Sequence, residues 1–499
     1  MKLALSPLEA WQPLPAGEWN EAAARHLLRR VAWSAPPGEV ARALREGLAA
    51  ALERLFPAAP PLMPTPPSVV TLEEDTPAFA RKLAAATPEN RRELLRQARE
   101  RSRDALLDLT VDWLQHARQP DCAATEKWTL FLSDVYVVAA QKVPNTALLC
   151  RHQELLRAHG AGPAPALTKA VLRSPAMINY LDLQQSRAGA PNENFARELL
   201  ELFTLGIGHY TENDIKEAAR AFTGYRQRQG EFFFARRLHD AGGKTIFRRT
   251  GRFDGDAVID LIYQQPAAGT HLPARLTRFY LTDEALPGEH LAALGAWWRG
   301  TGYDLRQLTH RYFSSRLFFD AQFRGACIKS PVQYYLGLLQ DFSLDVPPLP
   351  RRIVPAFRLM GQMLYNPPNV RGWVGGREWI SSTTLEARRL VARALFQPID
   401  RARLNADEQE ALESARAAGR AAFTVSDDGL RAHAGPDPEA TAARLLEALL
   451  PLAPADAYRR ALAAALTGDG GPTRSASPAN GRLRNAAVAI LETPEYQLC

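Results

Sequence analysis

Apolar residues recur at helical spacing through most of this chain, and this periodicity limits the fold more than any other feature. The pattern runs through "RRELLRQARERSRDALLDLTVDWLQHA", "EKWTLFLSDVYVVAAQ" and "TALLCRHQELLRAHG", and near the start through "NEAAARHLLRRVAW" and "PGEVARALREGLAAAL". Such spacing puts apolar side chains on one face of a helix. The sequence therefore predicts a mainly α-helical protein.

Helix starts recur as a hydroxyl residue followed by proline, at Ser174, Ser330 and Thr493. The hydroxyl can cap the first turn, and proline fits the first helical position because its missing N–H would be unpaired there. Ser330 is accordingly predicted to be a cap rather than a nucleophile.

Two segments depart from the helical pattern. "EFFFARRLHDAGGKTIFRRTG", residues 231–251, contains two strand-like runs across a glycine turn and predicts one hairpin. "NPPNVRGWVGGREWISS", residues 366–382, predicts an ordered loop that holds two tryptophans. The expected fold class is a large multi-helix fold with one small β-hairpin insertion and long ordered loops.

Proline and glycine content divides the chain into four predicted regions. The prolines of residues 56–77 remove amide donors, and this stretch is predicted to be a linker or extended strap without helix. "TGDGGPTRSASPANGR" predicts a flexible break before the last helix. The predicted regions are an N-terminal helical segment, the strap, a helical core and an Ala-rich helical region, at 1–55, 56–77, 78–396 and 397–499.

Charge and cysteine content exclude several functions. The net charge is +7, but the arginines are scattered, so we expect no nucleic-acid partner. No run of apolar residues is long enough for a membrane span. Residues 1–19 lack a signal sequence, which predicts a cytoplasmic protein. No CxxC pair suggests zinc or a dense disulfide framework, because the four cysteines lie far apart, at Cys122, Cys150, Cys327 and Cys499.

The segment "PNENFARELLELFTLG" is the first candidate site. Its polar residues fall on one helical stripe, which either faces water or points inward toward a site. Glu198 and Glu201 are the candidate catalytic carboxylates, and the candidate substrate-binding residues are Glu193, Asn194 and Arg197. Arg197 is expected to pair with Glu193 or Glu201 and to face the turn "LHDAGGKT".

That turn is the second candidate. His239 could act as a base with Asp240 orienting it, and Lys244 could bind an anion. The alternative is a solvated hairpin tip.

Two further segments could bind a ligand. Lys329 precedes a helix N-terminus, where free N–H groups favour an anion, although the sequence alone favours a surface lysine beside a cap. The loop could form an aromatic platform from Trp373 and Trp379, with Asn369 and Arg371 as polar groups beside it. Alternatively, the two tryptophan rings could fix the loop to the body of the protein. Common nucleotide, metal-protease and hydrolase motifs are absent, so the cofactor stays unassigned.

Six blocks in order give a specific resemblance: "PNENFARELLELFTLGIGHYTENDIKEAARAFTG", "LHDAGGKT", "GRFDGDAVIDLI", "IKSPVQYYLG", "GQMLYNPPNVRGWVGGREWI" and "LETPEYQ". The chain resembles the bacterial family catalogued as domain of unknown function 1800. The resemblance implies a large, mainly helical, uncharacterised protein. It also implies export as an alternative location and a sulfatase-like partner protein encoded nearby.

The chain departs from the family at one place. The family commonly has two histidines on the upstream helix, whereas here Ser133 and Val135 occupy the matching places in "FLSDVYV". Neither side chain suits a transition metal, so no tightly bound ion is expected there. The chain is identified as a divergent member.

Two classes of function remain open. We favour a binding or assembly protein that uses the Trp373 loop and retains part of an enzymatic site. The alternative is a hydrolase or oxidoreductase, with or without a metal, that acts on an anionic or polyhydroxylated substrate. The geometry separates them: an enzyme requires the candidate residues to meet at one open cavity.

Overall fold

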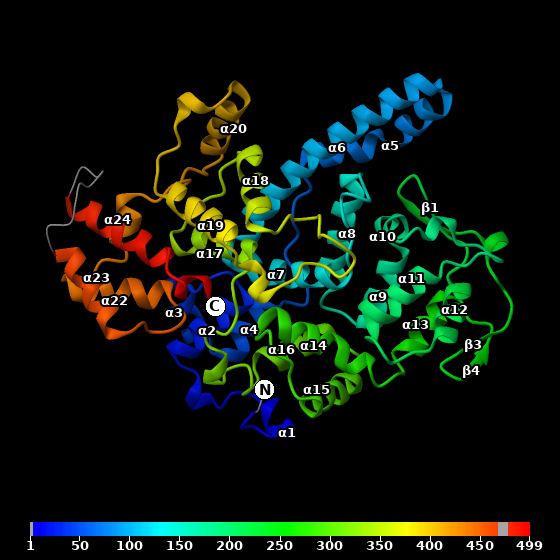
Figure 1. Cartoon of the computed structure of the whole chain (residues 1–499), viewed down its shortest axis with the longest axis horizontal. Helices are drawn as coiled ribbons and strands as arrows, with labels where there is room; N and C mark the ends of the chain where they lie inside the picture. The colour runs from blue at the N-terminus through cyan, green and yellow to red at the C-terminus, as the bar shows by residue number, and fades with distance from the viewer. Residues whose placement is uncertain (1–2, 468–477) are drawn as a thin grey trace.

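The computed structural model describes residues 3–467 and 478–499 and confirms a mainly α-helical protein with small β-hairpins (Figure 1). One hydrophobic core extends from Ala10 to Tyr496 and crosses all four predicted regions. A small second cluster lies beneath α20, around Leu412. Most of the predicted break before the last helix, residues 468–477, lies outside the described residues. No described helix combines the length and hydrophobicity that crossing a membrane requires.

The predicted N-terminal helices are present. Asn20 caps α2 by accepting a hydrogen bond from the Ala23 amide. The second predicted helix is divided in two at Gly47, whose φ of 79° ends one helix and begins the next. The helices of this region are α1 (Pro7–Ala10), α2 (Glu21–Val31), α3 (Pro37–Glu46) and α4 (Leu48–Leu55).

Two long helices, α5 (Pro67–Ala85) and α6 (Pro88–Ala117), form an antiparallel arm that projects from the body (Figure 1). The prediction of a helix-free strap over 56–77 is therefore wrong for its second half. Proline is compatible with a helix at its first position, and α5 begins at Pro67 in that way. Only the stretch before Pro67 is extended.

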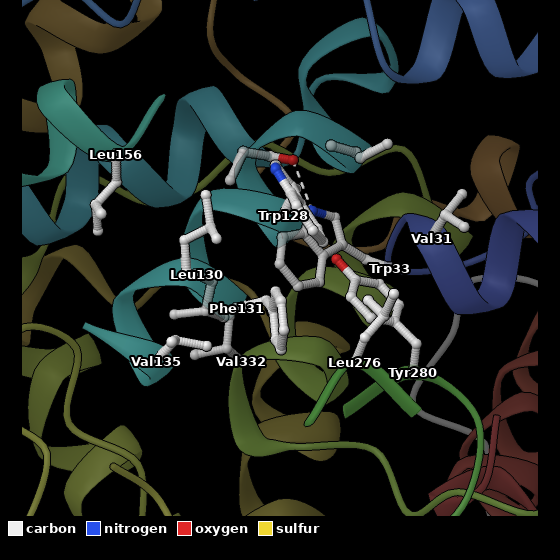
Figure 2. Close-up of a cluster of buried hydrophobic side chains, with 14 of the residues drawn as sticks. Val31, Trp33, Trp128, Leu130, Phe131, Val135, Leu156, Leu276, Tyr280 and Val332 are labelled. Atoms are coloured by element: carbon white, nitrogen blue, oxygen red, sulfur yellow. Dashed lines mark hydrogen bonds between the residues drawn. The ribbon is translucent and has the colours of Figure 1, made fainter. Parts of the chain in front are cut away.

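Helix α7 (Pro120–Val135) runs through the middle of the molecule, and all its residues from Ala123 to Ser133 are buried. Figure 2 shows its Trp128 and Phe131 among the side chains of Leu156, Leu276 and Val332, which come from other segments. Trp33 joins this cluster and donates a hydrogen bond from Nε1 to the Ala117 carbonyl at 2.7 Å. Beside α7 lies α8 (Thr146–His159), and α8 in turn contacts α9 (Ala164–Arg173) and α10 (Pro175–Tyr180).

The next region contains two hairpins, not one. The prediction paired the runs at either end of residues 231–251. Instead, "EFFF" pairs with the strand before it, and the residues after the glycine turn form their own hairpin. The strands are β1 (Tyr225–Arg228) with β2 (Glu231–Phe234), and β3 (Lys244–Ile246) with β4 (Arg249–Gly251). The helices here are α11 (Glu193–Glu198), α12 (Glu212–Ala221) and α13 (Gly255–Ile262).

After the last α-helical residue of α11, the chain remains helical but changes its hydrogen-bonding pattern. It continues as a π-helical turn, η3 (Leu199–Thr204), in which the Leu205 amide bonds to the Leu200 carbonyl. The wider turn rotates every later side chain away from the α-helical positions. The polar stripe predicted from α-helical spacing is therefore interrupted after Glu198.

The remaining helices complete the body. Ser330 caps α17 as predicted, with its Oγ accepting from the Gln333 amide at 3.2 Å. These helices are α14 (Ala268–Tyr280), α15 (Gly288–Gly300), α16 (Leu305–Phe313), α17 (Pro331–Asp341), α18 (Pro350–Met360), α19 (Ser382–Leu395), α20 (Ala406–Ala417), α21 (Asp427–Arg431), α22 (Pro438–Leu449), α23 (Asp456–Thr467) and α24 (Pro478–Leu491). Short 3-10 helices occur at Ala16–Glu18, Leu183–Gln185, Arg236–Leu238, Ala321–Phe323, Gly376–Trp379, Arg401–Arg403 and Glu495–Gln497.

Candidate functional site

Three of the four predicted segments meet at one cavity of about 440 Å³, called the central cavity below. Its walls come from α7, η3, α14, the start of α17 and the loop between α18 and α19. Its charged lining residues are Lys127, Asp134, Glu201, Arg275, Arg278, Asp283 and Arg371. Its large apolar lining residues are Trp33, Leu130, Leu202, Ile207, Phe279, Ile328, Trp373 and Trp379.

Lys127, on α7, is the most deeply buried charge of the cavity, with 3% of its surface exposed. Its Nζ donates to the Ala32 carbonyl at 2.8 Å and lies over the rings of Trp33 and Tyr280. Within the described part of the chain, no carboxylate forms an ion pair with this ammonium. Burial lowers the pKa of Lys127 to about 7.

Asp134, on the last turn of α7, joins three walls of the cavity. Arg275 donates from Nη2 to the Asp134 carbonyl at 2.6 Å and lies 3.3 Å from its Oδ2. The Trp373 amide donates to Oδ1 at 2.8 Å. Burial raises the pKa of Asp134, and the charge of Arg275 opposes that rise. This carboxylate fixes the aromatic loop to α7 and α14.

The π-helical turn contributes a carbonyl to the same wall. His271 Nε2 lies 2.8 Å from the Leu202 carbonyl and must donate to it, because a carbonyl only accepts. Arg275 Nη1 donates to the same oxygen at 3.2 Å. Burial lowers the pKa of His271 to about 4, so its imidazole is neutral at physiological pH. The turn thus connects the predicted segment to α14.

Of the four predicted catalytic residues, Glu201 alone lines the central cavity. Tyr210 Oη donates to its Oε2 at 3.3 Å, and Arg371 lies 3.6 Å from its Oε1. Glu198 is half-buried nearby, and both burial and the charge of Glu201 raise its pKa. Arg371 lies on the cavity wall, and its predicted role in binding a ligand beside Trp373 stays a prediction.

Two glycines let the aromatic loop close over acidic groups. A Cβ on Gly372, where φ is 86°, would overlap the carboxylate of Asp134. A Cβ on Gly376, where φ is 66°, would overlap the carboxylate of Asp283. This close approach explains Gly372 and Gly376, the first and last glycines of "RGWVGG". Trp373 and Trp379 line the cavity, and a ligand-binding role for their rings stays a prediction. Asn369 is exposed, and its Oδ1 accepts from the Arg371 amide.

The His239 turn lies away from the central cavity, and Asp240 does not orient the histidine. Asp240 instead binds the guanidinium of Arg220 through both oxygens, at 2.7 and 3.1 Å. These bonds hold the pKa of Asp240 down at about 2. Lys244 is buried, and its Nζ donates to the carbonyls of Asp240 and Gly242. The expectation of a base–carboxylate pair is therefore wrong in its geometry.

His239 itself contacts the preceding helix end. Its Nδ1 lies 3.0 Å from the Thr223 carbonyl, and its ring packs edge-on against Phe234.

Arg197 does not point inward at that turn. It forms a bidentate pair with Glu212, at 2.7 and 2.8 Å, on the surface, and 39% of its side chain is exposed. Arg197 therefore pairs with neither of its predicted partners, Glu193 and Glu201. Glu193 and Asn194 are exposed. The predicted geometry of the stripe is wrong, because the π-helical turn rotates Glu201 to the cavity while Arg197 stays outside.

Lys329 is not a surface lysine at a free helix end. Its side chain is buried, with Nζ 3.6 Å from the centre of the Tyr496 ring, and burial lowers its pKa to about 8. Arg388 donates to its carbonyl at 2.8 Å. Its neighbours Ile328 and Ser330 line the central cavity, but Lys329 does not.

The places of the family histidines also point away from the cavity. Ser133 is buried and donates to the Leu130 carbonyl, and Val135 is fully buried. Asp134, between them, is the residue that reaches the cavity. No three His, Cys, Asp or Glu side chains within residues 3–467 and 478–499 are grouped to hold a metal ion.

Sequence reasoning missed Lys127, Asp134, His271 and Arg275. The first two carried a weak signal, since they are charged residues inside an otherwise apolar stretch of helix, "EKWTLFLSDVYV". His271 and Arg275 lie four residues apart on α14, and this spacing puts both on one helical face. Which face meets the cavity depends on tertiary packing, which the local pattern does not contain.

The comparisons with known proteins identify a family. The sequence model of the family described as "Protein of unknown function (DUF1800)" matches residues 26–498, nearly the whole chain. The chain belongs to this family. No curated protein and no solved structure matches it.

Proposed function

We propose that this DUF1800 protein binds a small organic anion with an apolar body in the central cavity. The observation that carries the proposal is Lys127, a buried ammonium that borders the cavity and has no carboxylate partner among the residues that the structure describes. A buried charge is costly unless it is paired. An anionic group of a ligand would supply the missing partner.

The other charges of the cavity support an anion rather than a cation. Arg275 is paired with Asp134, and Arg371 lies beside Glu201, so these groups largely neutralise each other. Arg278 lies at the exposed edge and favours the ionised form of Asp283 there. Lys127 remains as the uncompensated charge at the buried end.

The aromatic lining supports an apolar body. Ligand cavities of about 300–1,000 Å³ typically combine apolar walls with few polar groups, and the central cavity has about 440 Å³. Trp33, Trp373, Trp379 and Phe279 supply flat apolar surface beside Lys127. An aromatic carboxylate or an aryl phosphate matches this combination in charge and shape.

An enzyme is the second candidate, and the pKa of Lys127 supports it. An amine that loses its proton near pH 7 can accept a proton or attack a carbonyl carbon. Glu201 is the predicted catalytic residue that shares the cavity. Borohydride reduction after incubation with 4-carboxybenzaldehyde should then label Lys127 ahead of the surface lysines, as read by peptide mass. Labelling of surface lysines alone would exclude an imine at this site.

Binding to a protein partner, including a sulfatase-like one, is less well supported. Both tryptophans of the loop face the cavity, and Trp379 is only 7% exposed. The one large apolar side chain that the loop exposes is Val374.

Ligand titration followed by tryptophan fluorescence tests the proposal. Phenyl phosphate and phenylacetate should bind saturably and more tightly than inorganic phosphate or the neutral phenyl glucoside. Affinity should fall as pH rises above 7, because Lys127 then loses its charge. Lys127→Met should weaken binding at least about tenfold, the effect of losing a charge-assisted contact of about 1.4 kcal/mol or more.

Lys169→Met is the matched control, because Lys169 forms an exposed ion pair with Asp260. It should bind the aryl anions like the unsubstituted protein. Equal affinities in both lysine variants, or tighter binding of the neutral glucoside than of the aryl anions, would contradict the proposal.

A further inference from the structure

Two cysteines oppose each other where the last residues of the sequence pair with the segment before α17. Ile328 and Leu498 form an antiparallel bridge. The Cys499 amide donates to the Cys327 carbonyl at 2.9 Å, one step along the same pair of segments. Opposed residues in such a pair have Cα atoms about 5.5 Å apart, inside the span of roughly 4.4–6.8 Å that disulfides bridge.

One guanidinium lies beside both sulfur atoms. Arg30 Nη1 donates to Cys499 Sγ at 3.9 Å. Burial raises the pKa of the Cys327 thiol to about 11, and the positive charge of Arg30 opposes that rise. The two thiols are therefore directed to the same side of the paired segments.

Each cysteine is buried yet borders a cavity. Cys327 is 7% exposed and lines the central cavity. Cys499 is 4% exposed and lines a second cavity of about 480 Å³ between α2 and the α22–α23 pair. Small reagents can therefore approach the pair from either side.

We propose that Cys327 and Cys499 form a reversible disulfide that ties the end of the sequence to the wall of the central cavity. The oxidant is a low-molecular-weight disulfide. One protein thiolate attacks a sulfur of the reagent and releases one small thiol, and the second protein thiolate displaces the other. In total, two cysteine thiols and one small disulfide become one protein disulfide and two small thiols.

The remaining cysteines provide the internal comparison. Cys150 donates to Glu154, and Cys122 lies on the first turn of α7. Within residues 3–467 and 478–499, neither one is opposed by a second cysteine in a paired segment. Only the Cys327–Cys499 pair is expected to cross-link.

Thiol counting on the whole chain tests the proposal. The folded protein is incubated with 2-hydroxyethyl disulfide, denatured, alkylated with N-ethylmaleimide and weighed by mass spectrometry. Two of the four cysteines should escape alkylation, and the unreduced peptide map should contain one linked pair, 327 with 499. Dithiothreitol should restore all four thiols. Four alkylated thiols, or oxidation confined to Cys122 and Cys150, would overturn the proposal.

Single variants separate this pair from accidental oxidation. Cys327→Ser and Cys499→Ser should each abolish the linked peptide, whereas Cys122→Ser should keep it. If either pair variant fails to fold, the peptide map of the unsubstituted protein still decides. The result does not depend on what the central cavity binds.

Discussion

The turn after β2 and the central cavity are both rich in charge, but they differ in how completely those charges are paired. At the turn, Arg220 binds Asp240 and Glu217, and Lys244 donates to two carbonyls. At the cavity, Lys127 is buried with one carbonyl and two rings. A satisfied network of charges stabilises a fold, whereas a buried charge without a counter-charge beside a cavity indicates a site. The paired charges of the turn lie in the quoted family blocks, whereas Lys127 lies outside them.

The largest effect is expected where the aromatic loop meets Asp134. Gly372→Ala would place a methyl group against the carboxylate that Arg275 holds, at a φ of 86° that alanine avoids. We expect a loss of about 4 kcal/mol in the free energy of unfolding, from left-handed strain and overpacking together. Denaturant unfolding measures this loss.

Gly361→Ala is the matched control. It has a φ of 95° at the end of α18, with no atom within 4 Å of the added methyl group. Strain alone should cost about 1 kcal/mol there. Equal losses in the free energy of unfolding at the two glycines would show that the loop does not pack against Asp134. The loop would then not form this wall of the cavity.

The second prediction concerns the pH dependence of Lys127. Its pKa is about 7 in the folded state against 10.5 for a free side chain, so the unfolded state binds more protons between those values. The stability of the natural protein therefore rises with pH across that window. Lys127→Met removes this term, so the variant should gain stability relative to the natural protein at low pH.

That relative gain should shrink by about 2.5 kcal/mol between pH 7 and pH 9, at up to about 1.4 kcal/mol per pH unit. Parallel unfolding curves at pH 6, 7, 8 and 9 measure it, with Lys169→Met as the control that should stay parallel to the natural protein. A constant difference for Lys127→Met would mean that its ammonium is not disfavoured by burial.

The third prediction breaks the paired cluster. Arg220→Ala leaves Asp240 and Glu217 without their shared partner and removes a bond to the Gly243 carbonyl. A loss of about 2 kcal/mol is expected, since bonds to charged groups contribute about 1.5–3 kcal/mol and the cluster is partly exposed. Aryl-anion binding should be unchanged, because the turn lies outside the cavity. Weakened ligand binding with intact stability would reverse the two assignments.

Much of the fold could be predicted because the signals for a helix come from residues that are close together in the sequence. The Ser-Pro cap at Ser330 and the periodicity of α6 and α7 depend on near neighbours in sequence. The hairpins were harder to predict from the sequence. The β1 strand, "YRQR", lacks the apolar alternation typical of a strand, so its pairing with "EFFF" could hardly be predicted from local sequence. The start of α5 was missed because proline was counted as a breaker rather than as a first helical residue.

The site was predictable only in part. Glu201, Trp373 and Trp379 line the candidate cavity, and the sequence names them as candidates because they stand out in composition and pattern. Lys127 was missed because its burial depends on contacts with Trp33 and Tyr280, which lie far from it in the sequence. The π-helical turn was also beyond sequence reasoning, because it changes the helical period within a continuous apolar pattern.

The smallest effect is expected at Arg197. Its bidentate pair with Glu212 has the same chemistry as the pair of Arg220 with Asp240, but it lies on the surface, in water. Exposed ion pairs are screened and contribute little, however good their geometry. Arg197→Ala should therefore unfold at nearly the same denaturant concentration as the natural protein, and 0.5 M salt should not widen the difference. The pair of Arg220 with Asp240 is less exposed, at 27% and 21% against 39% and 67%, and its carboxylate also accepts a bond from the Gly242 amide. The two variants together therefore measure what partial burial adds to one interaction. A loss at Arg197 as large as that at Arg220 would show that α11 packs more tightly than its exposure indicates, and would restore the inward-facing stripe.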